Sequence, residues 1–321
     1  MKRGRIIVVI TSVVAFVCAA AIYADSAYNG HDFPRNPKFA KYVKAKKAPD
    51  AYPGYRMVFA DEFNSGSKPN PEVWDYQVGF IRNKEVQYYQ PQNVSVRGGN
   101  LVIEARKERV RNPKYQPGSS NWAQAREYAD YTSGDIITRA DRGYKWGQGI
   151  YEARIRIPWS EGLWPAFWQY GERRTPYTGD ILYYTEIDIM EYYTKILLAN
   201  VCWGSYDLKK PVIEWDSSYN HLRYFPDGFL NSYHVYRMVW DEEKILLYCD
   251  DRLLNEMVID DIKLPDMDGK VYDYNPFKDP ENRMPIIFNI AMGRTGGSLE
   301  HTPLPARMYV DYVRVYEKIA D

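Results

Sequence analysis

Short runs of alternating apolar and polar residues repeat along the chain from about residue 55. The segment 149–157, GIYEARIRI, is the clearest case, because charged residues fill the positions between the apolar ones. Such alternation is typical of a β-strand with one face in a core. The apolar face of this strand is expected to consist of Tyr151, Ala153, Ile155 and Ile157.

Comparable runs, rich in Val, Ile and Tyr, continue to the end of the chain, and turn residues such as RGGN, YKWGQG and RTGG separate them. The last run, 308–316, alternates in the same way and places Val313 on the face opposite Val310. The sequence contains no long amphipathic helical pattern, fixed-period repeat or interior linker. It therefore predicts one all-β domain over residues 53–321, a sandwich or jelly roll.

The first 52 residues differ from the rest. A basic start, MKRGR, precedes an apolar run over 6–22, and IYA at 22–24 resembles a cleavage site. These features predict a signal peptide over residues 1–24 and an exported protein, periplasmic, cell-surface or extracellular, with no membrane span in the mature chain. A lipoprotein signal at Cys18 is a less favoured alternative, because Val17 stands where a small residue is required. Residues 25–52, polar and Lys-rich, predict a tether or lead-in.

The amino-acid composition limits the kinds of partner that the protein is expected to bind. The 321 residues include 42 basic and 42 acidic ones, and this balance argues against a nucleic-acid partner. Aromatic residues make up 16%, which fits either an aromatic β core or a surface that stacks sugar rings. The four His show no zinc spacing. Cys202 and Cys249 remain after signal removal, and two unpaired thiols are favoured over a disulfide.

Three acids, Glu186, Asp188 and Glu191, lie within the segment YTEIDIMEYY, 183–192. In a helix, Glu186 and Glu191 would point about 140° apart. In a regular strand they would lie on opposite faces. A β-bulge at Ile189–Met190 would shift the parity by one residue and bring all three acids onto one face.

Two glutamates on one face are what a glycosidase needs. One carboxylate attacks the anomeric carbon, and the other protonates the leaving oxygen and then activates water. Asp188, between them, could orient the nucleophile, and crowding of like charges should keep one carboxyl group protonated near neutral pH. The alternative, a solvated acidic strand face, is disfavoured because three acids on one face repel each other.

The hexapeptide EIDIME resembles the bulged Glu-x-Asp-x-x-Glu signature of glycoside hydrolase family sixteen. The resemblance extends from about Met57 to Glu317, through FADEF, NKEVQYYQPQNVSVRGGNLVIEA, GIYEARIRIP, GLWPAFW, YHVYRMVWDEEKILLYCDD, NPF and MYVDYVRVYE. It implies a curved β-jelly-roll sandwich with an open concave cleft. It also implies Glu186 as nucleophile, Asp188 as its assistant and Glu191 as general acid/base, with no cofactor for catalysis.

The resemblance also suggests substrate-binding residues. Trp164 and Trp168 share strand parity and could stack on sugar rings, or else belong to the core. Asn83, Glu85 and Arg139 match polar positions near the negative subsites, or are ordinary loop residues. Cys202 stands where laminarinases commonly carry a His, Gln169 and Tyr170 follow WPAFW, and the loop 170–184 is longer than expected. These departures leave β-1,3-glucan and β-galactoside substrates both open.

A structural calcium ion is implied by the same resemblance, with Glu62 and Asp311 as ligands, or else these are two ordinary surface acids. Oxygen ligands of this kind suit Ca²⁺. The sequence as a whole predicts a monomeric, retaining endo-β-glycosidase whose partner is a polysaccharide or glycan chain. The alternative is a non-catalytic carbohydrate-binding jelly roll. The three acids argue against this alternative, because binding alone needs no convergent carboxylates.

Overall fold

The computed structural model describes residues 6–9, 52–174, 182–206, 212–265 and 271–319. An eight-stranded sheet has, in spatial order, β1 (Ile6–Val9), β13 (Val212–His221), β12 (Ile196–Tyr206), β11 (Leu182–Tyr193), β10 (Leu163–Arg174), β19 (Ile286–Met292), β8 (Asp135–Thr138) and β3 (Trp74–Tyr76). A ten-stranded sheet has the path β16 (Arg252–Val258), β15 (Lys244–Cys249), β14 (His234–Trp240), β9 (Gly149–Arg156), β20 (Ala306–Lys318), β6 (Asn100–Arg111), β7 (Tyr128–Ser133) and β4 (Tyr88–Tyr89), with β2 (Tyr55–Asp61) on β20 and β5 (Val94–Arg97) on β6.

The remaining elements are short. Strands β17 (Leu264–Pro265) and β18 (Val271–Tyr272) form a small pair. Six 3₁₀ turns are described: η2 (Pro91–Asn93), η3 (Ala140–Arg142), η4 (Leu222–Tyr224), η5 (Phe229–Asn231), η6 (Pro276–Lys278) and η7 (Arg294–Gly296). Among the described strands, all pairings are antiparallel except that of β4 with β7. The all-β class predicted from the sequence is confirmed.

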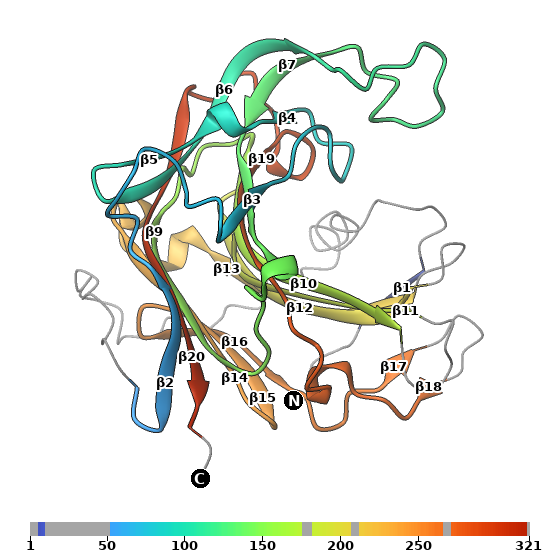
Figure 1. Ribbon diagram of the computed structural model, residues 1–321, viewed down its shortest axis with the longest axis vertical. Coiled ribbons are helices and arrows are strands. Elements are labelled where there is room, and N and C mark those ends of the chain that lie inside the picture. The colour runs from blue at the N-terminus through green and yellow to red at the C-terminus, as the bar shows by residue number, and fades with distance from the viewer. Residues whose placement is uncertain (1–5, 10–51, 175–181, 207–211, 266–270, 320–321) are drawn as a thin grey trace.

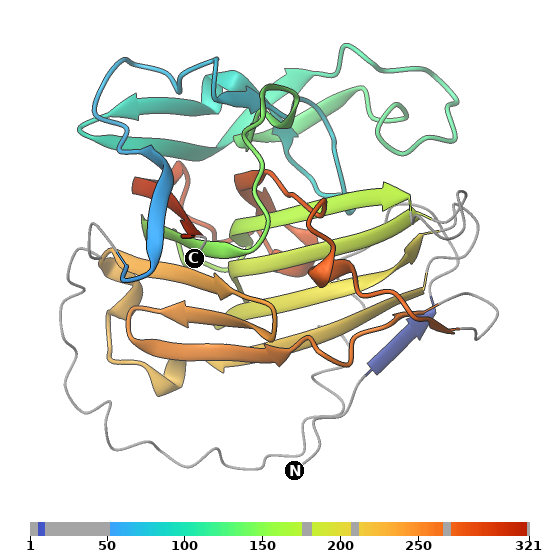
Figure 2. The same cartoon turned by 60° about the horizontal axis from the view of Figure 1, so that its bottom comes forward.

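The two large sheets form two layers (Figure 1). In Figure 2 the orange strands β14–β16 lie in front of the green and yellow strands β10–β13. The β6–β7 hairpin extends beyond this body, and its connecting loop projects at the top of Figure 1. Within the described residues, no helix has the length and hydropathy needed to cross a bilayer.

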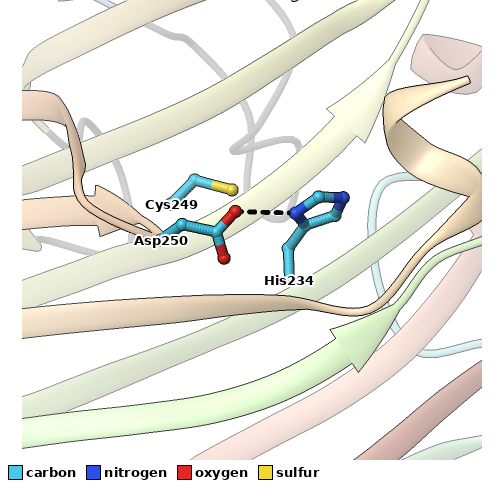
Figure 3. Close-up of side chains that lie close together, drawn as sticks. All are labelled: His234, Cys249 and Asp250. Carbon is cyan, nitrogen blue, oxygen red and sulfur yellow. Dashed lines mark hydrogen bonds and ion pairs between the residues drawn. The ribbon is translucent and has the colours of Figure 1, made fainter. Parts of the chain in front are cut away.

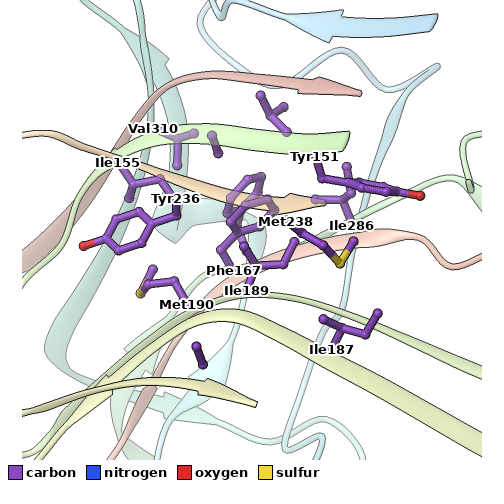
Figure 4. Packing of buried hydrophobic residues seen from close by; sticks show 14 of the residues in the cluster. Tyr151, Ile155, Phe167, Ile187, Ile189, Met190, Tyr236, Met238, Ile286 and Val310 are labelled. Carbon is purple, nitrogen blue, oxygen red and sulfur yellow. The ribbon is translucent and has the colours of Figure 1, made fainter. Parts of the chain in front are cut away.

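The core lies between the two sheets (Figure 4). Phe167 of β10 and Ile187 of β11 are fully buried in one cluster with Tyr151 and Ile155 of β9 and Met238 of β14. Each such side chain stabilises the fold by about 1.5–3 kcal/mol relative to an exposed position. The apolar face predicted for segment 149–157 is confirmed, because all four of its residues belong to this cluster.

The face assignment predicted for segment 308–316 is wrong. Val310 and Val313 both belong to the main core cluster, although strict alternation would place them on opposite faces. The register of β20 against β9 shifts between Val310 and Tyr312, so Asp311 is an extra residue in the strand. A bulge of this kind changes the parity of all later residues.

The N-terminal predictions fall mostly outside the described residues. Of the predicted signal peptide, only Ile6–Val9 is described, and this segment pairs antiparallel with β13 at the edge of the eight-stranded sheet. The predicted tether is outside the described residues except for Tyr52, whose hydroxyl donates a hydrogen bond to Glu152. The signal peptide and the tether stay predictions.

Candidate active site

The three acids lie on β11, beside a β-bulge at the predicted position. Asp188 pairs with Asn200 of β12, and Glu191 pairs with Leu198, so that two residues of β11 face one residue of β12. The two extra-register residues, Ile189 and Met190, are fully buried in the core cluster together with Ile187. The acids therefore share the opposite face, which turns away from the core.

Each acid is nearly inaccessible to solvent and is held by a neutral donor. Asn200 Nδ2 donates to Asp188 Oδ2 at 3.0 Å and to Glu191 Oε2 at 3.1 Å. Trp164 Nε1 donates to Glu191 Oε1 at 2.7 Å. The hydroxyl of Tyr184 donates to Glu186 Oε2. The exposed fractions of Glu186, Asp188 and Glu191 are 3%, 2% and 5%, so the donors replace most of the water that these carboxylates would bind.

Burial raises the pKa values of all three acids, and for the two glutamates the charges of the neighbouring acids raise them further. Burial, followed by the charge of Asp188, raises the pKa of Glu186 well above its usual value. Burial, followed by the charges of Asp188 and Glu186, does the same to the pKa of Glu191. Burial raises the pKa of Asp188 to about 6, although hydrogen bonds with Asn200 and the two glutamates oppose that rise. The cluster therefore retains a proton near neutral pH.

Arg82 is a site residue that the sequence analysis missed. Its guanidinium carbon lies 4.9 Å from the ring centroid of Trp168, and both terminal nitrogens donate to Asp135 Oδ2 at 2.8 Å. The charge of Arg82 lowers the pKa of Glu186 and so opposes the effect of burial. Arg82 follows β3 in a loop, and no periodic signal in the sequence indicates that this loop folds back over β10.

The two candidate stacking residues lie near the acids but are largely covered. Trp164 and Trp168 are 3% and 8% exposed, and each belongs to a small apolar cluster separate from the main core. Trp168 Nε1 donates to Asn289 Oδ1 at 2.8 Å, and its ring stacks with that of Tyr170 at a centroid distance of 5.5 Å. Their role in binding sugar rings stays a prediction.

Glu85 is the centre of a buried polar network. Its carboxylate accepts hydrogen bonds from Asn83 Nδ2 at 3.1 Å, Gln87 Nε2 at 2.6 Å and the Tyr89 hydroxyl at 3.1 Å. The Tyr89 hydroxyl also accepts from Asn289 Nδ2 at 3.1 Å, and Asn289 binds Trp168. The predicted residues Asn83 and Glu85 are thus connected to the site by hydrogen bonds.

The remaining binding candidates lie in different places. Arg139 is at the end of β8, where it binds Asp141 at 2.9 Å and the carbonyl of Pro71 at 3.2 Å. These contacts fit the alternative of a loop residue, and its role in binding stays a prediction. Cys202 is fully buried directly opposite Glu186 on β12. Cys202 and Cys249 are both free thiols, as the sequence favoured. Residues 175–181 of the long predicted loop are outside the described part of the chain.

The predicted calcium ligands do not fit a calcium ion in their present arrangement. Glu62 Oε1 accepts a hydrogen bond from Arg314 Nε at 2.7 Å, and Asp311 Oδ2 accepts one from Arg154 at 2.7 Å. A guanidinium at each carboxylate supplies the charge that a cation would otherwise provide. The calcium site stays a prediction without support from this geometry.

A second titratable cluster lies on the ten-stranded sheet (Figure 3). His234, Cys249 and Asp250 bring their ligand atoms within 4.8 Å of one another. However, His234 Nδ1 pairs with Asp250 Oδ2 at 2.8 Å, and its Nε2 pairs with the carbonyl of Phe229 at 2.6 Å. Asp250 Oδ1 also accepts from the amide of Val235 at 2.9 Å. Nδ1 thus joins β14 to the turn after β15, and Nε2 joins β14 to η5, so both ring nitrogens are engaged, which indicates a structural role.

Comparison with known proteins places this geometry in context. Residues 82–295 match the family model described as glycosyl hydrolases family 16. A β-glucanase of Rhodothermus marinus is 32% identical over 83% of this chain and 87% of that protein. A keratan-sulfate endo-1,4-beta-galactosidase of Sphingobacterium multivorum is 23% identical over 99% of this chain and 68% of that protein. A solved structure from work on the endo-acting O-glycanases with which human gut microbiota initiate mucin breakdown has a TM-score of 0.68 and 25% identity, over 84% of this chain and 94% of that one.

Proposed function

The chain belongs to the glycosyl hydrolases of family 16, and on that premise we propose that Glu186, Asp188 and Glu191 carry out its hydrolysis of β-glycosidic bonds with retention of configuration. The protein is an endo-acting β-glycosidase with the β-jelly-roll fold of this family. The observation that carries the proposed mechanism is the bulge at Ile189–Met190, because it brings the three acids onto one face.

In the first step, an oxygen of Glu186 attacks the anomeric carbon while the bond to the leaving sugar breaks. The electron pair of that bond goes to the glycosidic oxygen, which takes the proton of Glu191. The products are a covalent glycosyl ester on Glu186, an ionised Glu191 and a released sugar chain with a new hydroxyl group.

In the second step, a water molecule attacks the same carbon. Ionised Glu191 takes a proton from the water, and Glu186 leaves as a carboxylate. Two inversions at one carbon give net retention. Asp188 lies between the two glutamates and shares hydrogen bonds with both. Through these hydrogen bonds it helps to redistribute negative charge between Glu186 and Glu191 when the protonation of Glu191 changes.

The surroundings of the two glutamates support this division of roles. Burial and the charge of Asp188 raise the pKa of Glu186, whereas the hydrogen bond from Tyr184 and the charge of Arg82 oppose this rise and so favour the ionised form that a nucleophile needs. Glu191 experiences the charges of both other acids, which favour its protonated form. An ionised nucleophile beside a protonated acid is the starting state of a retaining glycosidase.

For the substrate, we propose a β-galactoside linkage within a galactose-containing glycan. Support comes from the similarity to a keratan-sulfate endo-1,4-beta-galactosidase over nearly the whole chain and to the structure from the mucin O-glycanase work. Cys202, directly opposite Glu186, differs from the His expected of a laminarinase. A β-1,3-glucan is the second candidate, which the 32% identity to a β-glucanase favours. We further propose that the protein is exported and acts as a monomer.

A substrate panel tests this proposal. Wild-type protein and the Glu186→Gln variant are incubated with keratan sulfate, mucin glycans, agarose, laminarin and mixed-linkage β-glucan, and product sizes are measured over time. We expect intermediate-length products from keratan sulfate or mucin glycans with wild-type protein only. Cleavage confined to laminarin or mixed-linkage glucan would overturn the substrate proposal. Full activity of Glu186→Gln would overturn the mechanism.

A further inference from the structure

We propose that Tyr184 is a positioning residue for the nucleophile, which orients Glu186 and stabilises its carboxylate form. This inference rests on the proposed function, because it takes Glu186 as the group that attacks the sugar. Tyr184 and Glu186 are two residues apart on β11, so their side chains lie on the same face. The hydroxyl of Tyr184 donates a hydrogen bond to Glu186 Oε2.

The direction of this hydrogen bond is fixed by chemistry. Burial, the charge of Glu186 and the neighbouring Cys202 together raise the pKa of Tyr184 well above its usual value. The phenol therefore stays protonated near neutral pH, and it donates to the Glu186 carboxylate. A donor at Oε2 restricts the rotation of the Glu186 carboxylate, so Tyr184 helps to fix its orientation.

The position of the Tyr184 ring is itself supported by neighbouring aromatic residues. The Tyr184 ring stacks with that of Tyr170 of β10, at a centroid distance of 6.3 Å and an interplanar angle of 27°. Tyr170 in turn stacks with Trp168 at 5.5 Å and 26°. Tyr170 pairs with Glu186 across the strands, so the row of rings runs beside the nucleophile. Offset stacking of this kind restricts rotation of the phenol.

The hydrogen bond acts differently in the two steps of the reaction. In the first step the Glu186 carboxylate loses charge as its ester forms, and in the second step the charge returns as the ester breaks. A donor to Oε2 stabilises the carboxylate that is leaving in the second step. Loss of the hydroxyl should therefore slow hydrolysis of the glycosyl-enzyme more than its formation.

The test compares Tyr184→Phe with Tyr183→Phe. The Tyr183 hydroxyl points to the other face of β11, where it donates to Asp279 Oδ2 at 2.9 Å, so the control deletes the same atom one residue away. The substrate is an aryl β-glycoside of the glycan that the substrate panel identifies, with a leaving group good enough for hydrolysis of the glycosyl-enzyme to limit kcat. We measure kcat, KM, the pH profile of kcat/KM and the melting temperature.

For Tyr184→Phe, we expect kcat to fall about tenfold with a parallel fall in KM, because the glycosyl-enzyme accumulates. We also expect the acidic limb of the kcat/KM profile to move to higher pH, because a hydrogen bond to the ionised form lowers the pKa of Glu186. Tyr183→Phe should leave the limb, kcat and KM as in the wild type. An unmoved limb and unchanged kcat in folded Tyr184→Phe would overturn the proposal.

Failure of the proposed function is distinguishable from failure of this inference. Intact-protein mass followed by peptide mapping locates the accumulated glycosyl group in each variant. If Tyr184 has no positioning role, the adduct still forms on Glu186 and Tyr184→Phe behaves as the wild type. If the adduct lies on another residue, the assignment of the nucleophile is wrong, and the inference about Tyr184 falls with it.

Discussion

The indole nitrogen of Trp164 donates a hydrogen bond of 2.7 Å to Oε1 of Glu191, although the two residues are on different strands. Ala166 of β10 pairs with Glu191 of β11, and Trp164 lies two residues before Ala166 on the same face. Trp164 is therefore hydrogen-bonded to the proposed general acid, Glu191. Its indole also packs against Tyr193 at a centroid distance of 5.5 Å, which holds the N–H in place.

The Trp164→Phe variant tests the role of this hydrogen bond. The change keeps an aromatic ring and removes the N–H donor. Because the Trp164 hydrogen bond lowers the pKa of Glu191, its loss should move the basic limb of the kcat/KM profile to higher pH. In Trp168→Phe the basic limb should stay in place, since the Trp168 N–H binds Asn289 instead. Equal shifts in both variants would show that the limb does not report on Glu191.

Asn200 connects two of the acids, so that Asn200→Ala should impair catalysis. Its amide donates to both Asp188 and Glu191, and hydrogen bonds to charged groups contribute about 1.5–3 kcal/mol each. We expect kcat to fall roughly 10-fold to 100-fold, with little change in KM. Measurement of kcat and melting temperature together separates this effect from unfolding. A variant with normal kcat would show that the hydrogen bonds from Asn200 to the two acids are not needed for the reaction.

Asp188 should lower the stability of the protein as pH rises. Its folded pKa of about 6 is above the value of about 3.9 expected in the unfolded chain, so the folded state binds the proton more tightly. This group's contribution therefore falls as pH rises from about 4 to about 6, and the loss is on the order of 3 kcal/mol above that window.

The Asp188→Asn variant removes this ionisation. Its melting temperature, relative to that of the wild type, should be higher at pH 7 than at pH 4. Thermal melts of both proteins between pH 4 and pH 8 measure the difference. A difference that is constant across this range would show that Asp188 has the same protonation behaviour in the folded and unfolded states.

Calcium should have little effect on stability if the arginine pairs of Glu62 and Asp311 persist in solution. A bound ion would raise the melting temperature with its concentration. The ion pairs with Arg314 and Arg154 predict equal melting temperatures in millimolar calcium and in EDTA. A rise of several degrees in calcium would favour the site that the family resemblance implies, with both arginines displaced.

The sequence predicted the features that depend on neighbouring residues. The all-β class followed from alternation, and the bulge at Ile189–Met190 followed from the spacing of the three acids. The same reasoning was wrong in β20, because the bulge at Asp311 has no acid pair to reveal it. A bulge is visible in a sequence only when residues on both sides of it must share a face.

Features that depend on register between strands were not predictable. Asn200 reaches Asp188 and Glu191 only because β12 pairs with β11 at that register. Arg82 reaches Trp168 because a loop folds back over β10, and Tyr184 could equally have pointed to solvent. The contacts of Asn200 and Arg82 join residues whose spacing along the chain shows no period, and the two-residue spacing of Tyr184 and Glu186 predicts a shared face but not a hydrogen bond.

The assignment of Glu186 and Glu191 to different roles is the central claim, and Glu191→Ala tests it most directly. With an aryl β-glycoside, whose leaving group needs little acid assistance, Glu186 should still attack, and the glycosyl-enzyme should accumulate because the base for its hydrolysis is missing. Azide should relieve the block and give a β-glycosyl azide. Intact-protein mass with peptide mapping locates the adduct, and proton NMR gives the product configuration. We predict an adduct on Glu186 and retained configuration; an adduct on any other residue, or an inverted product from the wild-type enzyme, would contradict the account.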